Sequence, residues 1–188
     1  MDCKPYQKAS RTHITQHFGV NPKPYQPNGH KGVDWAFKYG TWLVAPQRSI
    51  VSKIIGAKNV SEDLAPLSRG YGIVLKSLVE NNTYYLYWHC LPVFPVLVGQ
   101  EVQQGQPVAQ MGNSGFVMSG GWVVPVEVRT TKAHLGTHTH QEEFTEIGRR
   151  EYTNPLLDID WDIPVRIPWM MKLNAIKVIL NKMLNLLK

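Results

Sequence analysis

A chain of 188 residues with a hydrophobic fraction of 43% is expected to fold as one domain with a real core, and no apolar run reaches the ~18 residues of a membrane-spanning helix. The formal net charge is +6, but residues 166–188 carry five basic side chains and no acidic ones. This leaves 15 basic against 14 acidic residues elsewhere and argues against nucleic acid as a partner. The two cysteines, Cys3 and Cys90, form no CxxC pair, so we expect no thiolate zinc site and favour free thiols over a disulfide.

The N-terminal segment 1–29 is rich in proline and predicts irregular structure that ends at the Asn28-Gly29 turn signal. Met1 is not followed by the apolar stretch of a secretory signal. We therefore expect synthesis in the cytoplasm, with delivery by another route if the protein acts outside it.

Short strand-like runs follow from Val33 onward. Residues 41–44 and 50–55 flank a turn near Pro46, and residues 71–76 and 83–88 predict a hairpin around Asn81-Asn82. Six tryptophans, eight tyrosines and frequent turn residues fit the same structure. The predicted fold class is mainly β, an antiparallel β-sheet domain.

The end of the chain has a different pattern. Apolar residues recur at helical spacing over 169–187, with lysines and asparagines between them, and Pro168 suits a helix start. We predict a C-terminal amphipathic α-helix, which divides the chain into a body, 1–165, and a basic segment, 166–188. This helix is expected to pack on the body, to lie on an anionic membrane or lipopolysaccharide, or to bind a partner, and the sequence leaves these three open.

Two pairs of polar residues predict a metal site. His138 and His140 are two apart, so on a strand they point to the same face. His30 and Asp34 would lie ~13 Å apart on a straight strand, so the chain must bend between them, and Gly32 permits a bend. Three such ligands and a spare histidine are what a catalytic zinc site needs.

The remaining histidines are weaker candidates. His13 and His17 are four apart but lack the glutamate of an HExxH motif. His134 lies near the site in sequence and is more easily explained as a neighbouring or solvated side chain.

The surrounding residues resemble the M23 family of peptidoglycan metallopeptidases, the lysostaphin-type endopeptidases. His30 to Asp34 fits its H-x-G-x-D pattern, and residues 40–46 fit the G-T-x-V-x-A-P stretch that follows. Further matches keep their order along residues 12–157: the opening motif 15–19, the Y-x-H strand 87–89, the hairpin 98–109, the G-N-[ST]-G turn 112–115, the H-x-H motif 138–140 and the closing N-P motif 154–155.

This resemblance implies a role for each matching residue. His30, Asp34 and His140 would bind one zinc ion per chain, and His89 and His138 would be the two catalytic histidines. The metal would activate water and polarise the scissile carbonyl, while the two histidines would orient the water, accept its proton or hydrogen-bond the oxyanion.

Three departures from the family pattern stand out. The family follows H-x-H with Phe-Glu, whereas this chain has Gln141 to Phe144, which predicts a shifted strand or a repacked core. Residues 20–22 lack the usual arginine. The unusually long segment 116–135 contains residues 122–126 and 128–129, which are expected to form a small hairpin beside the groove.

The function expected from the resemblance is a zinc-dependent endopeptidase that hydrolyses peptide bonds in bacterial peptidoglycan, as a cell-wall lytic, endolysin-like enzyme. Its partner is then the cell wall in the periplasm or outside the cell, with a phage as one means of delivery. The alternative is a non-catalytic M23-like binding or structural module.

Overall fold

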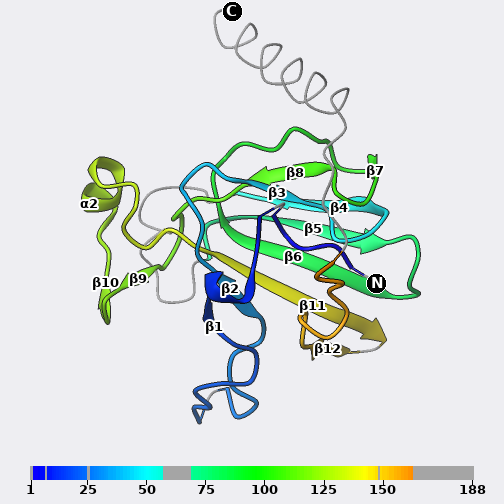
Figure 1. Cartoon of the computed structure of the whole chain (residues 1–188), viewed down its shortest axis with the longest axis horizontal. Helices are drawn as coiled ribbons and strands as arrows, with labels where there is room; N and C mark the ends of the chain where they lie inside the picture. Colours follow the sequence, from blue (N-terminus) through cyan, green and yellow to red (C-terminus); the bar gives the residue numbers. More distant parts are fainter. Residues whose placement is uncertain (1, 7, 25, 57–68, 148, 163–188) are drawn as a thin grey trace, which may run out of the picture.

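Figure 1 shows the computed structural model, which describes residues 2–6, 8–24, 26–56, 69–147 and 149–162. The predicted helix 169–187 and the boundary between the body and the basic segment lie outside these residues. In the part of the chain that is described, no helix has the length and hydropathy that a membrane crossing requires.

One eight-stranded antiparallel sheet organises the described chain, which confirms the predicted mainly antiparallel β class. Its central strands are long, and its outer strands are short. In spatial order the strands are β1 (Ile14–Gln16), β2 (Val33–Trp35), β11 (Thr139–Ile147), β6 (Thr83–Cys90), β5 (Tyr71–Ser77), β4 (Ser49–Ile55) and β7 (Glu101–Val102), and β12 (Arg149–Thr153) pairs with the second part of β11.

The predicted hairpin around Asn81-Asn82 is confirmed, because β5 and β6 pair directly and Asn82 adopts a positive φ of 56° in the turn. The predicted hairpin 98–109 is wrong. Its first half, β7, pairs with β4, whereas its second half, β8 (Pro107–Gln110), pairs with β3 (Trp42–Val44) in a separate two-stranded sheet.

The hairpin predicted from residues 122–126 and 128–129 is wrong in its strands, because the hairpin in the segment 116–135 is formed by β9 (Met118–Ser119) and β10 (Trp122–Val123). The residues after it are not a strand, however. Val126–Thr131 form the short helix α2, so that Val128 and Arg129 are helical. A second short helical turn, η1 (Arg11–His13), precedes β1.

The main core lies between the large sheet and the β3–β8 pair, which Figure 1 shows beside β4, β5 and β6. Alternating residues of β5 and β6 supply one wall, with Ile73, Leu75, Tyr85 and Tyr87 all fully buried. The Tyr87 hydroxyl donates to the Val44 carbonyl at 2.9 Å, so this polar atom is satisfied inside the core.

The N-terminal residues pack against the edge of this core. Asp2 is fully buried, and its carboxylate accepts hydrogen bonds from Tyr85 and Gln47. Its backbone bonds to Asp158 and Asp160. Cys3 and Cys90 are both buried and free, as expected, and burial raises the pKa of the Cys3 thiol to about 12.

Replacing Glu143 by Gln is expected to stabilise the protein increasingly as pH rises. Burial, with the Asp2 charge nearby, raises the pKa of Glu143 from its ordinary 4.5 to about 8. The unfolded chain therefore loses this proton first, and the native state loses stability between pH ~4.5 and ~8. Gln avoids this cost, so its advantage grows from near zero at pH 4 to of order 4 kcal/mol at pH 9.

Urea denaturation at both pH values measures this difference. Glu146→Gln, on the same strand but half-exposed, serves as the control and should show no comparable change. An equal advantage for Glu143→Gln at pH 4 and pH 9 would contradict the assigned pKa.

Candidate metal centre and active site

The pairing of β2 with β11 brings the two halves of the candidate site together. Asp34 and His140 are direct partners across these strands, and His30 lies just before β2. Gly32 is needed because the backbone of Gln141 approaches it closely: a Cβ at position 32 would lie 2.1 Å from the Gln141 carbonyl oxygen. A side chain at position 32 would therefore push His30 away from β11.

Three potential ligand atoms converge at this crossing. His30 Nε2 lies 2.8 Å from His140 Nδ1, and Asp34 Oδ1 lies 2.8 Å from His140 Nδ1 and 3.3 Å from His30 Nε2. This is the one group of three or more His, Cys, Asp or Glu side chains with metal-ligand spacing in the described chain. Bonds of ~2.1 Å from a single ion can reach all three atoms.

The outer hydrogen bonds of both imidazoles fix which nitrogen faces inward. His30 Nδ1–H donates to the His17 carbonyl at 3.1 Å, and His140 Nε2–H donates to Glu142 Oε1 at 3.1 Å. In the neutral rings, His30 Nε2 and His140 Nδ1 then carry lone pairs that point at each other and at a carboxylate. Three such acceptors are stable this close only when a cation, either a proton or a metal ion, lies among them.

The electrostatics favour an anionic Asp34 at this point. Burial opposes ionisation, but hydrogen bonds with His140 and His30 outweigh it and lower the pKa of Asp34. Burial also opposes a charge on His140, yet hydrogen bonds to Asp34 and Glu142 raise its pKa. The site is thus built to hold positive charge.

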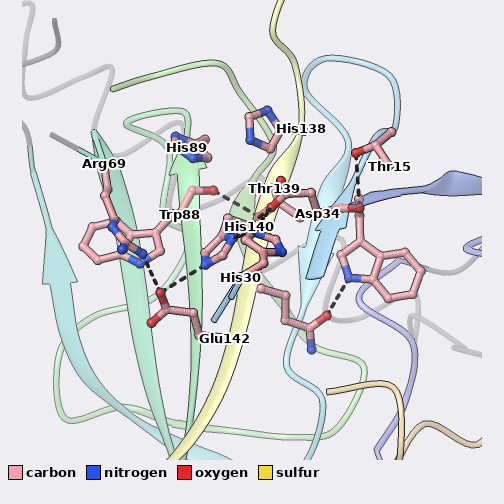
Figure 2. A network of polar contacts seen from close by, with 12 residues as sticks. Thr15, His30, Asp34, Arg69, Trp88, His89, His138, Thr139, His140 and Glu142 are labelled. Carbon is pink, nitrogen blue, oxygen red and sulfur yellow. Dashed lines mark hydrogen bonds and ion pairs between the residues drawn. The ribbon is translucent and has the colours of Figure 1, made fainter. Parts of the chain in front are cut away.

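Glu142 and Arg69 support His140 from behind, as Figure 2 shows. Glu142 is buried, and its Oε1 accepts from Arg69 Nη1 at 2.5 Å as well as from His140. Burial alone would raise the pKa of Glu142, but the interactions with His140 and Arg69 outweigh it and lower this pKa. This carboxylate was not among the predicted site residues, although strand alternation places it on the face of His138 and His140.

His89 and His138 lie together on another side of the cluster (Figure 2), with ring centroids 4.5 Å apart. His89 Nδ1–H donates to the Ser114 carbonyl at 2.8 Å, and His138 Nδ1–H donates to the Gly136 carbonyl at 2.9 Å. Each ring therefore keeps its Nε2 lone pair for another partner.

Both of these imidazoles are held neutral near pH 7. Burial lowers the pKa of His89, and the neighbouring His138 lowers it further. Burial also lowers the pKa of His138. His89 has a positive φ of 60° at the end of β6, a strained conformation for a residue with a Cβ and one that is common at functional sites.

A groove passes over this cluster. The segment 116–121, which includes the β9–β10 turn, forms one part of its lining, and the loop before β2 and strand β1 form another. The lining contains Thr15, Gln16, Lys31, Arg69, Phe116 and Met118 in addition to the five predicted site residues.

The other histidines are placed as the sequence suggested. His13 bonds to Ser10 and packs against Phe37, and the His17 side chain is exposed. His134 lines the groove but belongs to no metal-ligand group among the described residues.

The departure after His140 is explained by repacking rather than by a shifted strand. β11 pairs with β6 from His140 to Thr145 without a register break. Gln141 is fully buried and its Oε1 accepts from Trp35 Nε1 at 2.9 Å. A polar pair thus occupies the position where the family has phenylalanine.

The described chain thus combines an antiparallel sheet with a His–Asp–His cluster of metal-ligand spacing. The sequence profile of Peptidase family M23 matches residues 28–137. This is more than half of the chain, which therefore belongs to peptidase family M23. The match ends just before His138 and His140, which the structure nevertheless brings beside His30, Asp34 and His89.

Several solved structures share the fold. A structure of LytU has a TM-score of 0.55 at 23% identity, with 82% of this chain and 90% of that chain covered. A catalytic-domain variant of the prophage-encoded M23 protein EnpA from Enterococcus faecalis has a TM-score of 0.54 at 20% identity, with coverage of 85% and 98%.

A zinc-containing peptidase from Vibrio cholerae has a TM-score of 0.54 at 18% identity, and the match covers 81% of this chain but 39% of that longer one. Among curated protein sequences, none matches significantly.

Proposed function

We propose that this protein is a zinc-dependent endopeptidase that hydrolyses peptide bonds in bacterial peptidoglycan. The observation that carries the proposal is the convergence of His30 Nε2, Asp34 Oδ1 and His140 Nδ1 within 3.3 Å of one another, beside two neutral imidazoles. Membership of peptidase family M23 supplies the reaction class.

His30, Asp34 and His140 would hold the metal, one ion per chain. Two imidazoles and one carboxylate form a donor set that suits zinc. When bound, zinc supplies Lewis-acid chemistry that activates water and polarises the scissile carbonyl. The negative charge of Asp34 and the hydrogen bond from His140 to Glu142 strengthen the donor atoms.

His89 and His138 would carry out the proton transfers. Because each Nδ1–H is tied to a backbone carbonyl, the free Nε2 atoms can accept a proton from the attacking water. A protonated ring can then hydrogen-bond the oxyanion or return the proton to the leaving amine. Their low pKa values keep both rings ready as acceptors at neutral pH.

The biological role is proposed from the same family membership. A cell-wall lytic, endolysin-like enzyme acts on the periplasmic or outer side of the membrane, and phage delivery fits a fold shared with a prophage-encoded protein. The basic segment 166–188 would assist by contact with anionic membrane or lipopolysaccharide through residues 169–187. The alternative of a non-catalytic module gains no support, since all five polar site residues are present and assembled.

Digestion of several purified peptidoglycans, followed by mass spectrometry of the fragments, tests this function. The expected result is new amino and carboxyl termini within stem peptides or cross-bridges, lost with EDTA and restored by zinc. Intact peptides in every wall type with the zinc-loaded protein would overturn the proposal.

Removal of residues 166–188 should spare cleavage of purified wall while weakening lysis of intact cells.

Glu142→Gln is expected to weaken zinc binding by about 10- to 100-fold, since a neutral amide makes His140 a poorer donor and loses the ion pair with Arg69. Competition with a chromophoric chelator measures the affinity. Glu146→Gln, exposed on the same strand, is the matched control and should bind zinc normally. Equal affinities of the two variants would show that Glu142 has no influence on the metal.

A further inference from the structure

A buried arginine contacts the turn whose Ser114 carbonyl accepts a hydrogen bond from His89. Arg129 is 4% exposed on α2, inside the segment 116–135 where this chain departs from its family. Its Nη1 donates to the Asn113 carbonyl at 2.8 Å and also to the Gly115 carbonyl. The guanidinium thus binds the carbonyls of the two residues that flank Ser114 in the turn 113–115.

Asn113, in the same turn, bonds back to α2 and to the residues that follow this helix. The two hydrogens of Asn113 Nδ2 are shared among three carbonyls, those of Ala133 and Leu135 at 3.2 Å each and that of Arg129 at 3.5 Å. Arg129 and Asn113 are therefore reciprocal partners, with each side chain bonded to the other's backbone. Together they join the turn 113–115 to residues 133–135.

One joined segment contains, and the other directly precedes, a carbonyl that bonds a proposed catalytic imidazole. Ser114, between the two carbonyls bound by Arg129, accepts from His89 Nδ1. Gly136, next to Leu135, accepts from His138 Nδ1. Each imidazole thus bonds to a backbone oxygen whose neighbouring residues are held by the Arg129–Asn113 pair.

We infer that Arg129 is a positioning residue: it holds the residues on either side of the Ser114 carbonyl and, through Asn113, the residues just before the Gly136 carbonyl, and it thereby keeps His89 and His138 in the Nδ1–H tautomer with Nε2 facing the groove. Arg129 is not among the residues that line the groove or among the three converging ligand residues. The inference rests on the proposed catalytic role of the two histidines for its effect on rate, but its structural part stands apart from activity.

Imidazole nitrogen NMR of the full-length, ¹⁵N-labelled protein tests the structural part. The wild type should show Nδ1–H tautomers for His89 and His138, and Arg129→Met should show mixed tautomers. In the same variant kcat should fall about 10- to 100-fold, since small misplacements of a catalytic group cost about this much. KM and zinc content should be nearly unchanged.

Two further variants make the test decisive. Glu127→Gln removes a charge from the exposed side of the same helix and should leave tautomers and kcat as in the wild type. Arg129→Lys keeps the charge without the planar fork and should give an intermediate result. Wild-type tautomers and kcat in a folded Arg129→Met protein would overturn the inference. If that protein does not fold, the same result for Arg129→Lys would overturn it.

A loss of tautomer order without any wall cleavage by the wild type would leave the positioning role intact and reject the peptidase function. The two proposals therefore fail by different measurements.

Discussion

Asp34→Ala is expected to abolish both zinc binding and peptidoglycan cleavage. The substitution leaves two imidazole nitrogens 2.8 Å apart with no anion beside them, and two neutral donors do not hold zinc against water as three donors do. Removal of Lewis-acid stabilisation worth several kcal/mol lowers the rate by at least about 10³-fold. Metal analysis after dialysis should find less than about a tenth of an equivalent of zinc.

His17→Ala provides the matched control. Its side chain is exposed, and only its backbone carbonyl contacts His30, so zinc content and activity should match the wild type. An Asp34→Ala protein that retains a full equivalent of zinc would show that the metal binds elsewhere.

His138→Ala is expected to keep its zinc and lose its activity. The ring donates to the Gly136 carbonyl and contacts His89, but its nitrogens are not among the three converging ligand atoms. Loss of one general acid–base group lowers kcat by about 10²- to 10⁴-fold. Steady-state cleavage of a defined wall peptide, with zinc measured on the same sample, separates this effect from loss of the metal.

His89→Ala should behave similarly, and the double variant should lose little more than either single one, because the two rings act as a unit. His134→Ala tests the selectivity of this assignment, since His134 lines the same groove and should matter little. Nearly normal turnover by His138→Ala would remove it from the mechanism.

The sequence predicted the strand-rich fold best where pairing is local. β5 and β6 are consecutive strands that pair directly with each other across a short turn, so the pattern of a hairpin was complete within residues 71–88. Residues 98–109 had an equally hairpin-like pattern. Their partners are β4 and β3, which lie far back in the chain, and local periodicity does not specify such long-range pairing.

The candidate site likewise contains residues that a local pattern predicts and residues that it does not. His138 and His140 were predicted from strand alternation, and His30 and Asp34 from their spacing beside glycines. Glu142 obeys the same alternation but was interpreted as part of an altered motif. Arg69 and Arg129 carry no local signal, because each acts through contacts with residues distant in sequence.

The position of the three convergent atoms has a consequence for how the protein keeps its shape. His30 and His140 are separated by 110 residues, so an ion bound by both would act as a reversible cross-link between distant parts of the chain. Ligand binding of this kind shifts the folding equilibrium by mass action. If the proposed ion is bound, its removal would therefore lower the free energy of unfolding as well as the activity.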